Sequence, residues 1–529
     1  MSAAATLAPL PVVAPLLGAG ATLVLGRRPR LQRIVSIAVL VGVLAVALTL
    51  LMLVDAHGTI AVQVGGWTAD LGIAIVVDRL SALMLLVAAT VLLAVLAFAI
   101  GQGIRDGDER QPVSIFQPTY LVLAAGVSLA FLAGDLFNLY VGFEVLLVSS
   151  YVLLTVGGSA DRIRAGVSYV VVNLTSSLVF LIGIACCYAA TGTLNMARMA
   201  VRLESVPGGT RTALFAVLLV AFALKAAVFP LSAWLPDSYP TAPAPVTAVF
   251  AGLLTKVGVY AIIRADTLLF PYGALDNVLM VAALATMVVG ILGAIAQNDV
   301  KRLLSFTLVS HIGYMIFGIA LSTRAGLAGS IYYVMHHIVV QTALVLVVGI
   351  IERQGGSASL RRLGGLAAVS PLLGVLFLLP ALNLGGIPPF SGFLGKVALL
   401  QAGAADGSVL AWALVAGSVV TSLLTLYVMA RVWSKAFWRS RDDAPEGHLS
   451  DAGPVAEVDG AVDTAAAQRT IAGPIPLGML VPTAGMVAVS IALTVLAGPL
   501  VGVSQRAADS LHDRTSYLVA VLGDPGAGR

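Results

Sequence analysis

Long runs of apolar residues restrict the fold of this chain more than any other feature of its sequence. A helix needs about 20 residues to cross the roughly 30 Å hydrocarbon core of a bilayer, and most of the runs reach that length. Of the 529 residues, 59% are hydrophobic and only 11% are charged, which excludes a water-soluble globular chain and a disordered one. We therefore predict an all-α polytopic membrane protein. About fourteen transmembrane helices are expected, near residues 4–25, 34–54, 80–102, 117–134, 136–157, 165–190, 212–235, 242–264, 274–296, 303–322, 326–351, 369–400, 408–437 and 476–503.

The order of these runs divides the chain into five parts. Between the second and third runs, apolar and polar residues alternate over Ile60–Val64 before Gly65 and Gly66, which predicts a small external β-hairpin. Before the last run, an acidic segment rich in alanine, proline and glycine predicts a flexible loop. The five parts are 1–116 (helices 1–3 with the hairpin), 117–264 (helices 4–8), 265–437 (helices 9–13), 438–475 (a cytoplasmic loop) and 476–529 (helix 14 and a tail).

Two groups of five helices resemble each other in sequence. The tripeptide Arg-Ala-Gly opens helix 6 at Arg164 and helix 11 at Arg324, and the helix after each combines a lysine with prolines that break it. These residues are Lys225 with Pro230 in helix 7, and Lys396 with Pro388 and Pro389 in helix 12. Because the offset of five helices is odd, the second group must cross the membrane in the opposite direction. Inverted repeats with broken helices indicate a transport site near the midplane; chance similarity between apolar helices is the alternative.

The distribution of basic residues predicts the orientation in the membrane. The first run lacks the basic start of a secretory signal peptide, so we expect it to be retained as a helix. If the N-terminus lies outside, the gaps after the odd-numbered helices face the cytoplasm, and these gaps hold most of the loop arginines. This agrees with the positive-inside rule, and an even number of helices returns the C-terminus to the outside. Arg264 is counted here among the few basic residues of the outer gaps.

Ionisable residues inside the apolar runs are the strongest functional indication. Each charge at the bilayer centre costs at least about 2.5–3.5 kcal/mol, so such residues are rarely incidental. A buried lysine can release its proton whereas an arginine in practice cannot, and histidine titrates near neutral pH. We therefore predict an intramembrane proton path. Its predicted members are Glu144, Lys225, Lys256, His336, His337 and Lys396. A purely structural Lys–Glu ion pair between helices is the alternative.

Four further polar residues are candidates for the path or for its support. His311 could be a relay residue or a hydrogen-bonded packing residue, and Asp135 and Asp237 lie near helix ends, where an acid often caps a helix or faces solvent. The fourth is Gln341. The histidines lack the spacing of metal ligands, and no glycine-rich loop follows a strand. We therefore expect no metal, no cofactor, no nucleic-acid partner and no catalytic centre of an enzyme.

At this point the sequence resembles the antiporter-like subunits shared by respiratory complex I and the Mrp-type cation/proton antiporters, over nearly the whole chain. The last two motifs in the first half of the chain, near Trp234 and Lys256, most resemble the D-type subunits of Mrp antiporters. The motifs that carry the resemblance are Val76–Ser81, Gly134–Tyr140 with Phe143 and Glu144, Lys225 before Pro230, Trp234–Tyr239, Leu254–Tyr260, Asn298–Leu304 with Ser310 and His311, and Gly386–Lys396.

The resemblance implies fourteen helices with inverted repeats of helices 4–8 and 9–13. It implies that Glu144 tunes Lys225 on broken helix 7, that Lys256 links two half-channels and that Lys396 on broken helix 12 gates the other side. One departure is Gln341, because members of the family often have a lysine at this position, four residues after the histidine of helix 11. The resemblance further implies a bacterial plasma membrane, partners of the A, B, C, E, F and G types, contact with lipid, and H⁺ and Na⁺ as transported ions.

Two other functions remain open from the sequence. A proton-pumping subunit of a complex I-like NADH-quinone oxidoreductase or of a membrane-bound hydrogenase would share these motifs. A passive membrane anchor would keep the fold but would need none of the intramembrane lysines for ion movement. The first interpretation, a proton-translocating subunit of a multisubunit Na⁺/H⁺ antiporter, is the one that the motifs near Trp234 and Lys256 favour.

Overall fold

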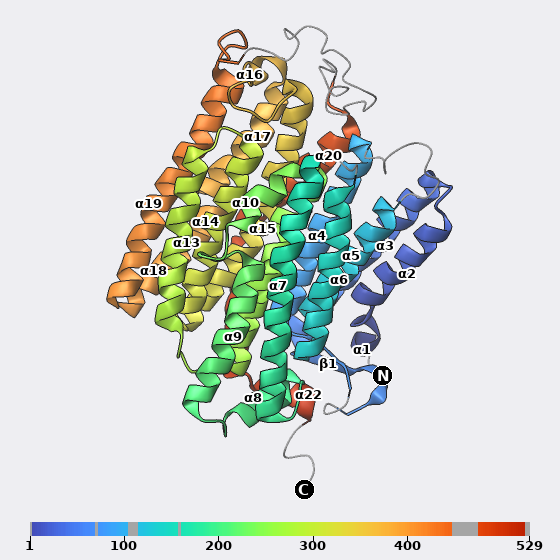
Figure 1. Ribbon diagram of the computed structural model, residues 1–529, viewed down its shortest axis with the longest axis vertical. Helices are drawn as coiled ribbons and strands as arrows, with labels where there is room; N and C mark the ends of the chain where they lie inside the picture. Colours follow the sequence, from blue (N-terminus) through green and yellow to red (C-terminus); the bar gives the residue numbers. More distant parts are fainter. Residues whose placement is uncertain (1–2, 69–71, 104–114, 157–159, 447–473, 524–529) are drawn as a thin grey trace.

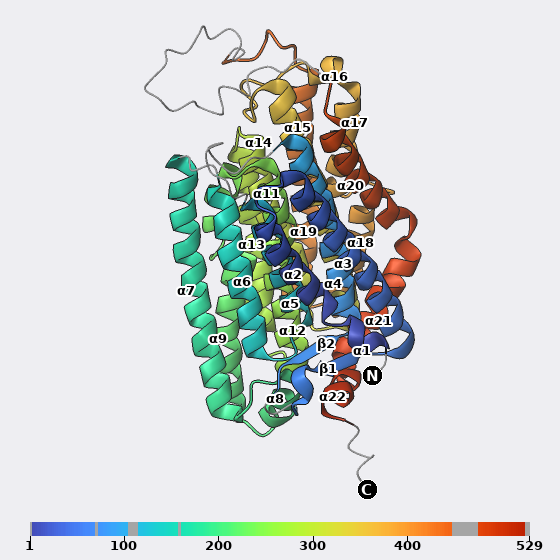
Figure 2. The same ribbon diagram turned by 90° about the vertical axis from the view of Figure 1, so that its right-hand side faces the viewer.

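The computed structural model describes residues 3–68, 72–103, 115–156, 160–446 and 474–523. Within them, twelve helices are long and apolar enough to cross a membrane, and two shorter apolar helices, Phe116–Leu132 and Pro371–Gly385, complete the series. The helices lie side by side along the long axis, and both termini lie near the same end (Figure 1 and Figure 2). The predicted all-α fold with about fourteen crossings is confirmed.

The N-terminal part combines three crossings with a β-hairpin. Strands β1 and β2 pair antiparallel, with Ile60 opposite Val77, so the hairpin expected from the alternating residues forms. The second strand leads to Asp78, which caps the third crossing by accepting a hydrogen bond from the Ser81 N–H at 2.8 Å. The elements are α1 (Ala3–Leu7), α2 (Leu10–Val24), α3 (Pro29–His57), β1 (Ile60–Gln63), the 3-10 turn η1 (Val64–Gly66), β2 (Ala74–Val77) and α4 (Arg79–Gln102).

The middle of the chain supplies the most deeply buried helices. The most apolar 18 residues of the crossing Arg324–Gly355 are all buried, as are those of the crossing from Ala244 to Leu269, whereas only 28% are buried in α3 and in the crossing Val409–Trp438. The elements are α5 (Phe116–Leu132), α6 (Leu136–Thr155), α7 (Ala160–Thr191), α8 (Met196–Leu203), α9 (Gly208–Ala226), α10 (Trp234–Ser238), η2 (Tyr239–Thr241), α11 (Ala244–Val249), η3 (Phe250–Leu254), α12 (Thr255–Arg264), η4 (Ala265–Leu269), α13 (Asp276–Ala296), α14 (Val300–Ala320) and α15 (Arg324–Gly355). Polar side chains on the central helices therefore face protein rather than lipid.

The remaining helices complete the bundle. They are α16 (Leu366–Val369), α17 (Pro371–Gly385), α18 (Ser391–Asp406), α19 (Val409–Val432), η5 (Trp433–Trp438), α20 (Leu477–Val495), α21 (Ala497–Asp513) and α22 (Thr515–Leu522). We call the end that carries both termini, the hairpin, α8 and α22 the terminal face, and the opposite end, which carries α16, the loop face (Figure 1).

Both predicted helix breaks are present. The seventh crossing ends as a regular helix at Ala226 and resumes in α10 at Trp234, so Pro230 lies in the irregular segment between them. The run 369–400 divides into α17 and α18, with Pro388 and Pro389 between them. The prolines lack a backbone N–H and cannot continue a helical hydrogen-bond ladder, which is why the sequence located these breaks correctly.

Two predicted boundaries were wrong. The eighth crossing continues to Leu269 through the π-helical segment η4, so Arg264 is a buried residue of a membrane span and not a loop charge. The last run was expected to continue as one helix to residue 503, but α20 ends at Val495 and α21 begins at Ala497. Of the predicted loop 438–475, residues 447–473 lie outside the described residues.

Candidate functional site

Lys225 and Glu144 are joined through a serine from a third helix. The Lys225 Nζ donates hydrogen bonds to Ser177 Oγ at 3.1 Å and to the Asn173 carbonyl at 3.4 Å. The Ser177 hydroxyl in turn donates to Glu144 Oε1. The ammonium and the carboxylate therefore share one hydroxyl group, contributed by α7, and are not in direct contact. A proton can pass between them along this hydrogen-bonded row with small shifts of position.

The break after Lys225 is held by side chains. Ala227 has left-handed backbone angles, φ 58°, which ends α9 immediately after the lysine. The Phe229 N–H donates to Thr286 Oγ1 on α13 at 3.0 Å, and the Trp234 indole N–H donates to the Leu224 carbonyl at 3.2 Å. Groups that lose helical partners at the break thus find new ones, which keeps the irregular segment stable inside the bundle.

Lys256 lies next to another irregularity. Its Nζ donates to the Ala251 carbonyl at 2.5 Å, inside the π-helical segment η3, and the side chain is fully buried. Two residues further on, Gly258 packs directly on the end of α9: a Cβ there would lie 2.6 Å from the backbone nitrogen of Ala226. The glycine allows α12 to approach the residue beside Lys225, so the two lysine-bearing segments are in contact.

Three histidines and two tyrosines form a buried cluster between Lys256 and Lys396. His311 Nδ1 and the Tyr333 hydroxyl are 2.5 Å apart, and the rings of His311 and His337 have centroids 5.1 Å apart. His336 Nδ1 is 3.0 Å from Ser391 Oγ. Among the described residues, both ring nitrogens of His337 and the Nε2 atoms of the other two histidines have no hydrogen-bond partner. These groups can take up and pass on protons.

Lys396 lies at the second helix break. Its Nζ donates to the carbonyls of Leu384 at 3.0 Å and Gly385 at 3.2 Å, and lies 5.0 Å from the ring centre of Tyr314. Those carbonyls belong to the last turn of α17, where helical partners are missing and the helix dipole favours a cation. Asn383 Oδ1 accepts a hydrogen bond from the Gly392 N–H at 2.8 Å and so caps the start of α18.

Electrostatic interactions connect these groups into two sets, and the close packing of Gly258 on Ala226 brings the two sets together. Glu144 interacts with Lys225, Lys256 interacts with His337 and His311, and Lys396 interacts with all three histidines. Within the described part of the chain, no carboxylate forms an ion pair with Lys225, Lys256 or Lys396. Each of the three lysines is hydrogen-bonded by hydroxyl or carbonyl oxygens.

The remaining predicted residues lie outside these two sets or at their edge. Asp237 is exposed and pairs with Arg302 at 2.8 Å. Asp135 caps α6, accepting a hydrogen bond from the Asn138 N–H at 2.6 Å; burial raises the pKa of this carboxyl to about 6 against the lowering effect of backbone hydrogen bonds. Gln341, one turn beyond His337, is buried and donates to the Leu304 carbonyl at 3.0 Å.

Sequence reasoning missed two features. Tyr333 was not singled out, although its spacing of three and four residues from His336 and His337 places all three on one face of a helix. The second feature is the buried ion pair of Asp78 with Arg264, at 2.6 Å, whose side chains are 7% and 4% exposed. Arg264 was assigned to a loop, so its partner could not be sought.

The structure contains no clustered metal ligands among the residues it describes, taking groups of three or more His, Cys, Asp or Glu side chains. The candidate site is built from glutamate, lysine, histidine, tyrosine and serine side chains. Its arrangement suits proton transfer from one broken helix to the other, in a direction parallel to the plane of the membrane.

Comparison with known proteins gives consistent matches. The family model described as "NADH:quinone oxidoreductase/Mrp antiporter, TM" matches residues 133–425. The chain is 37% identical to the D-type subunit of the Na(+)/H(+) antiporter of Alkalihalophilus pseudofirmus over 516 residues, covering 97% of this chain and 98% of that protein. It is similar to a chain of the Mrp complex from Dietzia sp. DQ12-45-1b, with a TM-score of 0.87, 35% identity, and coverage of 99% and 100%. A chain of the membrane-bound sulfane sulfur reductase, an archaeal respiratory membrane complex, shares the fold with a TM-score of 0.83, 24% identity, and coverage of 97% and 99%.

Proposed function

The chain belongs to the family of transmembrane subunits shared by NADH:quinone oxidoreductases and Mrp antiporters, and on this basis we propose that it is the proton-translocating D-type subunit of a multisubunit Na⁺/H⁺ antiporter. The observation that carries the proposal is the line of three buried lysines, each held without an ion pair among the described residues. Such lysines can exist in charged and neutral forms, whereas an ion-paired lysine is held in its charged form.

The first step of the path is transfer between Glu144 and Lys225. Ser177 accepts from the ammonium and donates to the carboxylate, so its hydroxyl relays a proton by exchanging one hydrogen bond for another. Glu144 stabilises the charged form of Lys225 through space, and protonation of Glu144 removes that stabilisation. The state of the carboxyl therefore decides whether Lys225 holds or releases its proton.

The second step runs from Lys256 through the histidine–tyrosine cluster to Lys396. His311, Tyr333 and His337 supply groups that both accept and donate protons, and Ser391 connects to His336. Because positive charges on Lys256, Lys396 and the histidines repel one another, a proton that arrives at one end favours release at the other. With Gln341 in place of a lysine, this step depends on the histidines and on water between them.

We further propose that the loop face lies in the cytoplasm of a bacterial cell and that both termini lie outside. The loop face carries the arginine-rich connections, and the positive-inside rule supports this orientation. Partners of the A, B, C, E, F and G types, as in other Mrp systems, would complete the antiporter. Protons would then move inward along this chain while Na⁺ leaves the cell.

We propose that residues 117–264 and 265–437 are inverted repeats. The broken crossing made by α9 and α10 runs from the terminal face toward the loop face, whereas α17 and α18 run the other way (Figure 1). Each broken crossing carries one lysine of the path. Opposite directions of this kind give each half of the path access to a different side of the membrane.

Na⁺ is expected to collapse a pH gradient across everted membrane vesicles that contain this chain with its partner subunits. The vesicles come from cells without other antiporters and are energised before Na⁺ is added. Collapse on addition of Na⁺, and not of choline, supports the antiporter. If Na⁺ has no effect and a quinone substrate instead drives acidification, the chain belongs to a redox pump and the proposal is wrong.

Replacing Glu144 with glutamine is expected to reduce the rate of this Na⁺-dependent collapse by about 10- to 100-fold, because Lys225 loses its carboxylate while its bonds to Ser177 and Asn173 remain. Assembly with the partners is expected to be unchanged. The matched control is Glu446→Gln, which removes an exposed glutamate that pairs with Arg361 and Arg362 at the loop face. Equal rates for the two variants would remove Glu144 from the path.

A further inference from the structure

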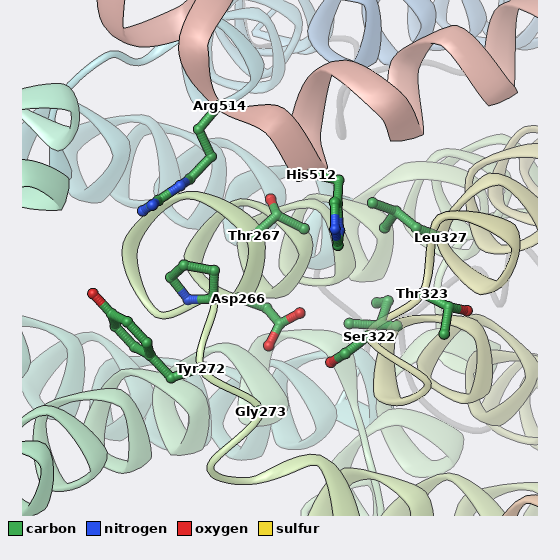
Figure 3. A pocket seen from close by; sticks show the side chains of 11 residues that line it. Asp266, Thr267, Tyr272, Gly273, Ser322, Thr323, Leu327, His512 and Arg514 are labelled. Carbon is green, nitrogen blue, oxygen red and sulfur yellow. The ribbon is translucent and has the colours of Figure 1, made fainter. Parts of the chain in front are cut away.

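A cavity of about 250 Å³ lies at the terminal face, separate from the lysine–histidine line. Its walls come from η4 and the loop that follows it, the end of α14, the start of α15, and the junction of α21 with α22 (Figure 3). These segments are far apart in sequence, and the function proposed above uses none of the side chains that line the cavity.

Asp266 is the charged group of this cavity. Its residue is only 7% exposed, and its carboxylate points into the cavity toward Ser322 (Figure 3). Among the described residues it has no hydrogen-bond or ion-pair partner. Asp276, at the start of α13, interacts electrostatically with Asp266; its carboxylate accepts a hydrogen bond from the Ser322 hydroxyl, and its Oδ1 atom is buried without a partner among the described residues. Two carboxylates in this arrangement are unfavourable unless a cation or a proton joins them.

The basic side chains around the cavity are engaged elsewhere. Arg514 donates to the Leu268 carbonyl at 3.4 Å and to Glu204 at 3.5 Å, Arg324 pairs with Asp509 at 3.6 Å, and Arg211 lies 3.9 Å from the ring centre of Tyr272. His512 points into the cavity from the end of α21 (Figure 3). None of these arginines forms an ion pair with Asp266, so no described cation balances the charge of its carboxylate.

We propose that this cavity is a Na⁺ site in which the Asp266 carboxylate is the charged ligand and the hydroxyl oxygen of Ser322, which donates its hydrogen to Asp276 and keeps its lone pairs, is a neutral ligand. Oxygen donors are the ligands that hard cations prefer, and a single carboxylate inside the cavity matches a single positive charge. The choice of Na⁺ among such cations rests on the proposed antiporter function.

The backbone around the cavity supports a specialised role. Ser322 and Arg514 have left-handed angles, with φ of 49° and 59°, although neither is glycine. The third such residue in the described chain is Ala227, next to Lys225. Conformations that are unfavourable for residues with a Cβ atom gather at functional sites, where the surrounding structure holds them in place.

The cavity is close enough to the proton path for an electrostatic effect. Asp266 and Lys256 lie on one continuous crossing, ten residues or about 15 Å apart along its axis. The buried side chains of Ile319 and Leu327 form the apolar part of the cavity wall. A Na⁺ ion bound at Asp266 therefore repels protons on Lys256 and its histidine neighbours. Binding of one ion weakens binding of the other, which is the relation that antiport requires.

The site is tested by chemical labelling of Asp266 in the purified, assembled complex with dicyclohexylcarbodiimide, located by mass spectrometry. We expect NaCl to slow labelling of Asp266 and choline chloride at the same concentration to have no effect. Ser322→Ala is expected to raise the half-protecting Na⁺ concentration by about 3- to 10-fold, because one neutral ligand is lost. Thr267→Val is the matched control, since this cavity hydroxyl is already donated to the Ile263 carbonyl, and it should leave protection unchanged.

Labelling that responds to pH but not to Na⁺ would overturn the site and make Asp266 a proton acceptor only. Equal protection in wild type and in Ser322→Ala would remove Ser322 as a ligand and overturn the site as described. The labelling result does not depend on whether the complex transports ions. Protection by Na⁺ in a complex that does not exchange Na⁺ for H⁺ would support the site and refute the antiporter function. Exchange of Na⁺ for H⁺ without protection of Asp266 would support the antiporter function and refute the site.

Discussion

Replacing Lys225 with alanine is expected to lower the rate of Na⁺-dependent collapse of the pH gradient by at least about 100-fold, which is the lower end of the range for loss of a positioned proton-transfer group. Lys225 is the only lysine joined to Glu144 through a shared hydroxyl in the described structure, so its removal leaves Ser177 with no proton donor on one side. The measurement is the Na⁺-induced change of internal pH in everted vesicles at equal amounts of assembled complex.

Two further variants separate proton transfer from packing. Lys225→Arg keeps the positive charge but cannot release a proton near neutral pH, so it is also expected to be inactive while assembling normally. Lys435→Ala removes a half-buried lysine near the loop face, outside the path, and is expected to transport at the wild-type rate. If Lys225→Arg transports normally, the lysine serves as a fixed charge and does not carry the proton.

Replacing Asp78 with asparagine is expected to lower the stability of the fold by about 3–5 kcal/mol, because Arg264 would remain buried without a counter-charge. Arg264 also donates to the Tyr260 hydroxyl at 3.1 Å, and Tyr260 donates to the Phe131 carbonyl at 2.7 Å, so the pair connects the hairpin, α12 and α5. The measurement is the fraction of monodisperse complex that survives heating in detergent.

The double variant Asp78→Asn with Arg264→Gln provides the control, since removal of both charges avoids a buried unpaired ion. It is expected to be more stable than Asp78→Asn alone; if it is no better, the loss does not arise from the unpaired arginine. Burial raises the pKa of Asp78, but the charge and hydrogen bond of Arg264 outweigh this and lower it overall. The stabilisation is therefore complete above the ordinary carboxyl pKa and is lost as the pH falls through the lowered value.

The sequence predicted the number and order of the crossings and the two broken helices. Hydropathy is a local property that adds up over about 20 residues, and a proline removes a helical hydrogen bond wherever it lies, so neither prediction needed tertiary information. Pro15, Pro380 and Pro482 nevertheless lie inside helices. The boundary error at Arg264 has the same origin. A charged residue near the end of an apolar run is assigned to a loop when hydropathy alone is used, because its distant partner Asp78 is not visible.

The candidate path was found only in part. Glu144 and the three lysines stand out in the sequence because a charge is costly inside a bilayer. Ser177 and Tyr333 do not stand out, since serine and tyrosine are common in membrane helices and acquire a role only through their neighbours. Asp135 and Asp237 were candidates by residue type, and the structure places the first at a helix cap and the second in an exposed pair with Arg302.

The sequence alone determined that this chain is a bundle of membrane helices with rare charges inside its apolar runs, because apolar length and local helix breaks follow from neighbouring residues. Only the tertiary structure decided which groups those charges meet: Ser177 between Lys225 and Glu144, carbonyls of an unwound turn for Lys396, Asp78 for Arg264, and a cavity for Asp266. Such pairings depend on which faces of distant helices come together, and contacts between residues far apart in the chain leave no local pattern in it.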